Sequence, residues 1–234
     1  QRAYDQVLTE ICLQNLPVVF AIDRAGVFGA DGESHQGLYD IEYLSGMPGM
    51  TIMSPRDAGE LQNMLDYAFQ LNAPCAIRYP RGKAPAPIAI SASQPNQPAA
   101  YVPAPQCNRD GMDVVFISDG GMLPAVLEAA ALLEEKRISC AVWDLKQLKP
   151  LPEHFLNYAF HHWHHMVVVE DGDCCCGVGV RIAAKATLAG CRVLSVGWPD
   201  EFIEQGSPTQ LKARYGLDGA GIACRTERFL ENKA

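Results

Sequence analysis

Residues 23–37 read Asp-Arg-Ala-Gly-Val-Phe-Gly-Ala-Asp-Gly-Glu-Ser-His-Gln-Gly and follow directly on the apolar residues 18–22. Four of these fifteen residues are glycine, and the run also holds two aspartates, one arginine and one histidine. The apolar residues before it predict a buried strand. Glycine lets a backbone turn sharply and approach a ligand closely, and open α/β sheets bind ligands at the carboxyl ends of their strands. The run therefore indicates a ligand-binding loop in an α/β fold.

Strand-like and helix-like segments alternate on both sides of this loop. Residues 51–53 and 75–78 are short apolar segments typical of strands, and the helix predicted between them has apolar side chains at i, i+3, i+4, i+7 and i+8 from Leu61. Ser54 as the cap and Pro55 at the first helical position would begin that helix. Apolar strands that alternate with helices predict a parallel sheet covered on both faces.

The same alternation returns after a proline-rich stretch. Residues 84–108 hold six prolines among alanine, serine, glutamine and asparagine, which is the composition of an extended linker. Beyond it, residues 109–234 predict a complete doubly wound α/β domain, in which Ser207 and Gln210 form a capping box. The strands predicted there are residues 114–117, 140–143, 167–170 and 193–196.

The overall composition excludes several classes of partner. The 234-residue chain is 48% apolar and 20% charged with a net charge of −8, which argues against nucleic acid or an anionic membrane as the partner. No apolar run approaches the roughly 18–20 residues of a membrane-spanning helix. Nine cysteines, an odd number at no framework spacing, are typical of reduced thiols in the cytosol. Gln1 is not an initiator residue, so we expect the chain to start inside a longer protein, which leaves N-terminal targeting open.

Four polar side chains near the predicted strand ends point to chemistry on a phosphorylated small molecule. Arg24 and Arg81 each lie just past a strand, and a guanidinium group binds phosphate oxygens through two parallel hydrogen bonds. His35 titrates near neutral pH and can move protons, while Asp31 could orient a substrate hydroxyl or the imidazole. The alternative is a turn-rich loop whose charges face water, and the pattern alone leaves both interpretations open.

Five segments resemble the 1-deoxy-D-xylulose-5-phosphate synthase family. They occur along the chain in the same order as in that family, and the similarity covers essentially the whole chain. They are Asp-Arg-Ala-Gly at 23–26, Asp-Gly-Glu-Ser-His-Gln-Gly at 31–37, Arg-Tyr-Pro-Arg-Gly at 78–82, Gln-Arg-Ala-Tyr-Asp-Gln at 1–6 and Val-Gly-Trp-Pro-Asp-Glu-Phe-Ile at 196–203. The shorter core Asp-Gly-x-Ser/Thr-His-Gln also occurs in transketolase, whereas the Asp-Arg-Ala-Gly lead and the glycine after His-Gln favour the synthases.

This resemblance implies an enzyme that condenses pyruvate with glyceraldehyde 3-phosphate, releases carbon dioxide and uses thiamine diphosphate and Mg²⁺, for isoprenoid-precursor, thiamine and pyridoxal biosynthesis. It implies that His35 transfers protons and stabilises an oxyanion near the cofactor's reactive carbon, and that Asp31 contacts the substrate hydroxyl region. Arg24 and Arg81 would bind the acceptor phosphate, with Arg2 contributing from the start of the first helix. The resemblance also implies a homodimer in the bacterial cytoplasm or the plastid stroma.

By the same resemblance, residues 1–83 are the C-terminal part of a transketolase-like pyrimidine-binding domain with an incomplete parallel sheet. Residues 84–108 are the linker, and residues 109–234 are a transketolase C-terminal domain. The family's diphosphate- and magnesium-binding domain, and its Gly-Ile-Ala-Glu-Gln segment, have no counterpart in the sequence. We therefore expect a fragment that is inactive alone, with the main cofactor ligands outside this chain and an open sheet edge. The alternatives are a non-catalytic assembly or regulatory domain, a transketolase, or a 2-oxo acid dehydrogenase β-subunit.

Two segments rich in histidine or cysteine raise the question of a metal site. His161 and His165 at i, i+4 could share a helix face, but no carboxylate or cysteine lies near them in sequence, which favours surface histidines. Cys174, Cys175 and Cys176 stand where the family has a glycine-rich turn. Because neighbouring side chains diverge, we expect these cysteines to fill a tight turn, and we predict no metal ligand in the chain.

Overall fold

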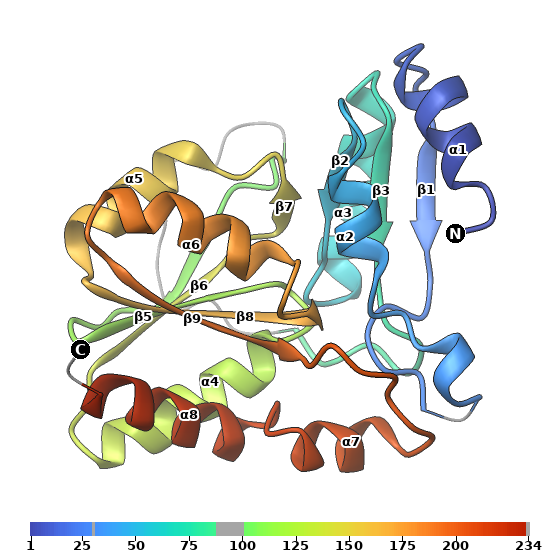
Figure 1. Ribbon diagram of the computed structural model, residues 1–234. Helices are drawn as coiled ribbons and strands as arrows, with labels where there is room; N and C mark the ends of the chain where they lie inside the picture. The colour runs from blue at the N-terminus through green and yellow to red at the C-terminus, as the bar shows by residue number, and fades with distance from the viewer. Residues whose placement is uncertain (30, 88–100, 233–234) are drawn as a thin grey trace.

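The first of two β-sheets is built mainly from the N-terminal part of the chain (Figure 1). The structure is a computed structural model and describes residues 1–29, 31–87 and 101–232. In spatial order this sheet consists of β1 (Val19–Ile22), β3 (Cys75–Arg78), β2 (Thr51–Met53) and β7 (Gln147–Lys149). The first three strands are parallel, as predicted, and β7 is antiparallel to β2. Around them lie α1 (Tyr4–Gln6), a π-helix (Val7–Cys12), a 3₁₀ turn (Glu33–His35), α2 (Asp40–Ser45) and α3 (Ala58–Gln70).

The second sheet is built from the C-terminal part of the chain. In spatial order it consists of β4 (Gln106–Arg109), β6 (Cys140–Asp144), β5 (Val114–Ser118), β8 (His165–Asp173) and β9 (Arg192–Trp198). Only β4 is antiparallel to its neighbour. The helices of this unit are α4 (Leu123–Glu135), α5 (Glu153–His162), α6 (Val178–Leu188), α7 (Pro208–Arg214) and α8 (Gly219–Glu231). None of the helices that the structure describes is long and apolar enough to cross a membrane.

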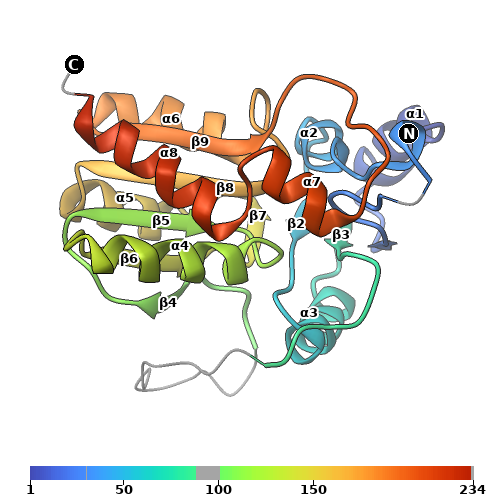
Figure 2. The same ribbon diagram turned by 90° about the horizontal axis from the view of Figure 1, so that it is seen from below.

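Helices cover both faces of the second sheet, which confirms the doubly wound arrangement (Figure 2). The side chains of β5 show this directly, because successive residues of a strand point to opposite faces. Val114 and Phe116 pack in one cluster with buried residues of α4 and α8. Val115 and Ile117 pack in another with residues of α5 and α6. All four side chains are fully buried.

The two units share their hydrophobic cores. Ile41 and Leu44 of α2 and Ile52 of β2 belong to the same buried cluster as Val115 and Ile117 of β5. The strand β7 extends this contact, because it belongs to the C-terminal unit in sequence but pairs with β2 of the first sheet. The units therefore fold against each other as one body, and a residue at the end of β3 has a fixed position relative to β5 and β8.

The start of α3 differs from the sequence prediction. Asp57, and not Ser54, caps this helix by accepting a hydrogen bond from the Glu60 N–H at 2.8 Å, and the helix begins at Ala58. Ser54 is buried, and its N–H donates to the Lys146 carbonyl at 2.8 Å. The segment before α3 is thus held by the C-terminal unit, which a local capping rule does not take into account. The capping box at Ser207 and Gln210 is present, as predicted.

Among the described residues, the elements that were not predicted from the sequence are α2, α5, β4, β7 and the 3₁₀ turn Glu33–His35. Strand β4 begins within the residues expected to form the linker. The rest of that prediction falls partly on residues 88–100, which lie outside the described residues. At the other side of the first sheet, β1 is an edge strand, and no strand among the described residues pairs with its outer side.

A buried guanidinium joins the carboxyl ends of the two sheets. Arg78, the last residue of β3, is 2% exposed. Its Nε and Nη2 donate to the two carboxylate oxygens of Asp40 at 2.9 and 3.2 Å, and its Nη1 donates to Asp119 Oδ2 at 3.0 Å. Nη2 also donates to the backbone carbonyl of Asp171 in β8 at 2.8 Å. Burial raises the pKa of Asp119 above its ordinary value, and the charge of Arg78 opposes this rise. The ionised form of Asp119 therefore depends on its ion pair with Arg78.

We predict that Arg78→Ala lowers the free energy of unfolding by about 3–5 kcal/mol, because removing one partner leaves buried carboxylates without compensation. Denaturant unfolding of the purified chain measures this change. The matched control is Lys185→Ala, which removes a cation from an ion pair with Glu153 whose side chains are 43% and 58% exposed. That pair should contribute less than about 1 kcal/mol. Equal losses in the two variants would contradict the central role of Arg78.

Candidate functional site

The glycine-rich loop after β1 folds back on itself and closes against the C-terminal unit. Gly26 and Gly37 exchange two backbone hydrogen bonds of 2.8 Å, and the Ala25 N–H donates to the carbonyl of Tyr79, just past β3, at 3.0 Å. Gly26 has φ +76°, and a Cβ there would lie 2.2 Å from Asp171 Oδ2. Only glycine satisfies both conditions. The loop is therefore built at the junction of β1, β3 and the end of β8.

Gln36 fixes the tip of this loop from inside. Its side chain is 9% exposed, and its Oε1 accepts hydrogen bonds from the N–H groups of Phe28 at 2.7 Å and Gly29 at 3.3 Å. Its Nε2 donates to the carbonyl of Glu204 at 3.3 Å, and the Gly206 N–H donates to Gly29 at 3.3 Å. Sequence reasoning assigned Gln36 no role, although it is part of the His-Gln-Gly segment. Its role became visible only once the loop was placed against residues far along the chain.

Two arginines from different strand ends meet on one aromatic ring. The Cζ atom of Arg81 lies 4.5 Å from the centroid of the Phe28 ring, and that of Arg24 lies 5.2 Å from it. Arg24 also pairs with Asp23 at 2.8 Å, and its φ of +60° is a left-handed conformation. Arg81 is exposed and forms no ion pair with any residue that the structure describes. The Phe28 ring therefore gathers two guanidinium groups at one place on the surface.

The structure places the other candidate residues around this pair without joining them to it. His35 lies in the 3₁₀ turn of the same loop, exposed, with Nδ1 3.0 Å from Ser34 Oγ. Asp31 is exposed near the tip of the loop. Arg2 is exposed ahead of α1, and within the described residues no hydrogen bond or ion pair connects it to the loop. The arrangement thus unites Arg24 and Arg81 and leaves His35, Asp31 and Arg2 as separate exposed groups.

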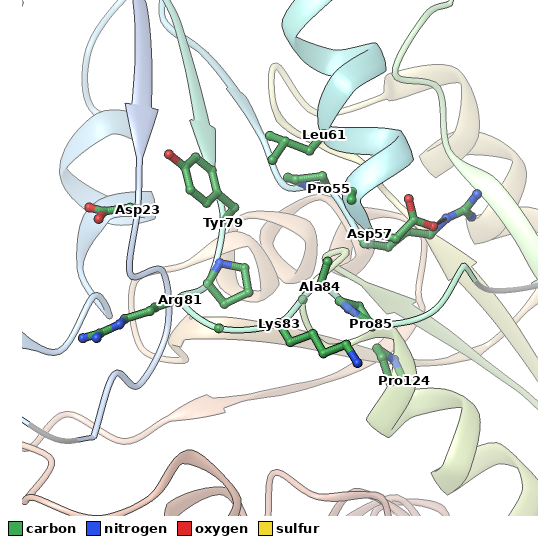
Figure 3. A pocket seen from close by; sticks show the side chains of 15 residues that line it. Asp23, Pro55, Asp57, Leu61, Tyr79, Arg81, Lys83, Ala84, Pro85 and Pro124 are labelled. Carbon is green, nitrogen blue, oxygen red and sulfur yellow. Dashed lines mark ion pairs between the residues drawn. The ribbon is translucent and has the colours of Figure 1, made fainter.

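A cavity of about 420 Å³ lies behind Arg81, between the two units (Figure 3). It is lined by apolar and polar groups from both, among them Leu61, Tyr79 and Lys83 of the N-terminal part and Pro124 of α4. In Figure 3 the Arg81 side chain extends away from Lys83, toward the side on which Asp23 is drawn. Arg81 and Asp23 are themselves among the lining residues, so the cavity borders the surface where the two arginines meet.

Two glutamates behind the loop have strongly perturbed pKa values. Burial raises the pKa of Glu170 to about 7, although the N–H groups of Gly179 and Val178 donate to its carboxylate at 2.8 and 2.7 Å. Burial, together with the charges of Glu170 and Asp40, raises the pKa of Glu42 to about 8. Both carboxylate oxygens of Glu42 are buried without a hydrogen-bond partner. Burial therefore favours the protonated form of Glu42.

Side-chain atoms that could share a metal ion gather at the turn after β8. Within residues 1–29, 31–87 and 101–232, the only group of three ligand atoms close enough to share an ion belongs to Asp173, Cys174 and Cys175. Neither the glycine-rich loop nor the cavity behind Arg81 has such a group. His161 and His162 end α5 as exposed residues, and their Nδ1 atoms lie 2.6 and 2.8 Å from carbonyls of their own helix.

Comparison with known families finds two matching domains. Residues 1–87 match the family described as the transketolase pyrimidine binding domain. Residues 105–222 match the family described as the transketolase C-terminal domain. Together these two matches include both β-sheets and the loop that carries Arg24 and His35.

The relatives that the chain resembles in sequence carry one name. This chain is 41% identical to 1-deoxy-D-xylulose-5-phosphate synthase 1 of Geobacter sulfurreducens, over 100% of this chain and 36% of that protein. It is 40% identical to the synthase of Pseudoalteromonas atlantica (98% of this chain, 36% of that protein) and 38% identical to that of Magnetococcus marinus (98% and 37%). The chain spans little more than a third of the length of these curated relatives.

A solved structure has the same fold. The structure described as "Split gene transketolase, inactive beta4 tetramer" superposes with a TM-score of 0.85 at 24% identity, covering 100% of this chain and 73% of that one. This likeness bears on the fold alone. It agrees with the two sheets and their covering helices described above.

The protonated Glu42 predicts a stability that falls as pH rises. Its folded-state pKa, about 8, lies above its ordinary value of 4.5, so the folded state binds the proton more tightly. This contribution is complete below the unfolded pKa and is lost as pH rises through about 8. We expect Glu42→Gln to be more stable than the parent chain at pH 8, by about 2–4 kcal/mol, and equally stable near pH 4. Denaturant unfolding at several pH values measures the difference. Glu33→Gln, at an exposed position of the loop, is the control, and parallel curves for Glu42→Gln and the parent would refute the assignment.

Proposed function

This chain belongs to the transketolase family, and we propose that it forms the acceptor side of the active site of a 1-deoxy-D-xylulose-5-phosphate synthase. Such an enzyme joins pyruvate to glyceraldehyde 3-phosphate with release of carbon dioxide. Family membership implies dependence on thiamine diphosphate, which supplies the carbanion chemistry when bound. The names of the sequence relatives support this choice within the family.

The observation that carries the proposal is the pair of guanidinium groups on Phe28. A phosphate monoester has two negative charges and accepts several hydrogen bonds, and two planar donors on one surface match it. Arg81 is available for this because none of the described residues pairs with its charge. Arg24 keeps donors free beyond the single contact with Asp23. These residues would hold the acceptor by its phosphate, so that its aldehyde points away from the ring.

His35 and Asp31 would act on the other end of the acceptor. An exposed imidazole on the same loop can exchange a proton with the acceptor's oxygen, as histidine does in general acid–base catalysis. Asp31 would accept a hydrogen bond from a substrate hydroxyl, and Arg2 would add a third cation to the phosphate site. The loop holds His35 and Asp31 to a common base through Gln36 and the Gly26–Gly37 hydrogen bonds.

We also propose that the ligands of the cofactor's diphosphate and of Mg²⁺ come from polypeptide outside this chain, since the chain spans little more than a third of the length of its curated relatives. The chain alone would then not turn over. We propose further that the complete enzyme is a homodimer in the bacterial cytoplasm or the plastid stroma, and the relatives named above are bacterial. Sedimentation of the purified protein would measure the oligomeric state.

Replacing Arg81 tests the phosphate site. In the complete enzyme we expect Arg81→Ala to lower kcat/KM for glyceraldehyde 3-phosphate by roughly 10–100-fold, as expected for the loss of a charge-assisted contact. Use of an unphosphorylated aldehyde acceptor should change little. The matched control is Arg192→Ala, since Arg192 also lies over an aromatic ring, 4.8 Å from the centroid of Phe229. An equal loss with both acceptors would argue against phosphate binding by Arg81.

Replacing His35 tests the chemical step. We expect His35→Ala to lower kcat by about 10²–10⁴-fold in the complete enzyme, the usual range for a general acid or base, with little change in the KM for the phosphorylated acceptor. His161→Ala, an exposed histidine at the end of α5, is the control. Full activity of His35→Ala would defeat the proposed role.

Activity of the enzyme with sugar-phosphate donors and no use of pyruvate would assign it to transketolase chemistry. The absence of activity in any complete assembly would favour a non-catalytic domain.

A further inference from the structure

The turn between β8 and α6 carries three consecutive cysteines whose side chains do not all diverge. A carboxylate oxygen of Asp173 and the Sγ atoms of Cys174 and Cys175 lie within 4.8 Å of one another. This differs from the sequence expectation that neighbouring cysteines point apart. The reason is that β8 ends at Asp173 and the chain turns at once, so residues 173–175 do not alternate as they would in a strand.

Hydrogen bonds from several elements hold this turn in place. The Cys174 N–H donates to the Trp198 carbonyl at 2.9 Å, and the Ser195 hydroxyl donates to the Cys174 carbonyl at 3.3 Å. The Cys175 N–H donates to Asp173 Oδ1 at 2.6 Å. On the other side, the Asp173 N–H donates to the Leu38 carbonyl at 3.2 Å. The backbone that presents the three ligand atoms is therefore fixed before any ion arrives.

We propose that Asp173, Cys174 and Cys175 bind a thiophilic divalent metal ion of the Zn²⁺ class. Zn²⁺ binds thiolate sulfur at about 2.3 Å and carboxylate oxygen at about 2.0–2.2 Å in a tetrahedral arrangement, which places neighbouring ligand atoms roughly 3.5–3.8 Å apart. From separations of at most 4.8 Å, the three atoms thus need to approach one another by no more than about 1.3 Å. Two thiolates and one carboxylate leave the fourth position to water. The proposal does not depend on the proposed catalytic function.

The charges around the turn favour a cation. Asp173 forms no ion pair with a residue of the described ranges, and the carboxylate of Asp200 adds to the negative potential at Cys176. Because a metal ion binds the thiolate form of cysteine, Zn²⁺ bound at this turn would release protons from Cys174 and Cys175.

The position of the turn gives an ion access from solvent. Cys175 is exposed, Cys174 is half-buried and Asp173 is buried. One ligand is thus held rigidly in the protein and one reaches the surface. Cys176 is also exposed, but its Sγ is not part of the group. Two adjacent exposed cysteines, one inside the ligand set and one outside it, give a matched pair of variants.

The test is metal binding by the purified, fully reduced chain. We expect one equivalent of Zn²⁺ per chain with a Kd on the order of 1 µM or below. Co²⁺ at the same site should give thiolate-to-metal charge-transfer absorption. Cys175→Ser should weaken Zn²⁺ binding by at least the roughly 10–100-fold that loss of even an outer-shell partner costs, while Cys176→Ser should leave it within a few-fold of the parent. Asp173→Asn should weaken binding and keep the charge-transfer band.

Circular dichroism of each variant verifies that it is folded, and Cys175→Ser, at an exposed position, keeps the test valid if Asp173→Asn does not fold. The absence of a charge-transfer band with Co²⁺ would overturn the proposal. Equal weakening by Cys175→Ser and Cys176→Ser would overturn the assigned ligand set. Unchanged binding in Cys175→Ser would place the ion elsewhere on the chain.

Discussion

The contact between Arg78 and its carboxylates is the interaction on which the relative position of the two units depends. One guanidinium group at the end of β3 contacts Asp40 at the start of α2, Asp119 after β5 and the backbone of Asp171 in β8. All of these groups are buried, so a displacement of one unit would leave charges in a medium of low dielectric constant without partners. The contact therefore permits only a narrow range of arrangements of the two sheets.

The glycine-rich loop takes its geometry from this junction. The carboxylate of Asp171 accepts hydrogen bonds from Trp198 at 2.8 Å and Lys212 at 3.3 Å, and it lies against Gly26. Burial alone would raise the pKa of Asp171, but the charges of Lys212 and Arg78 lower it below its usual range. A carboxylate that stays ionised thus forms the floor of the loop, while the exposed Arg24 and Arg81 form its outer surface. The loop therefore has a negative charge on its inner side and two positive charges on its outer side.

The sequence predicted those parts of the structure that depend on local pattern. Apolar strands, the alternation of strands with helices and the capping box at Ser207 are all visible in short windows of residues.

The sequence did not predict β4 and β7, which are short and have few apolar residues. It also placed the cap of α3 at Ser54, because the hydrogen bond from Ser54 to Lys146 joins residues far apart in the chain. The roles of Gln36 and Arg78 were not predicted either, because their partners also lie far along the chain. Both residues belong to quoted motifs, residues 31–37 and 78–82. Arg24 and Arg81 lie over one ring in the structure, their phosphate binding stays a prediction, and Phe28, the ring between them, was not singled out from the sequence.

The pairing of β7 with β2 limits how the gene for such a chain can be divided and recombined during evolution. A cut in the gene at the proline-rich stretch separates two regions that look independent in sequence, yet it divides one sheet, since Gln147–Lys149 lie in the sheet of the N-terminal unit. Shuffling either region onto an unrelated neighbour would expose the edge of β2 and its buried side chains to water. The two regions are therefore expected to be inherited together, because both contribute strands to the same sheet.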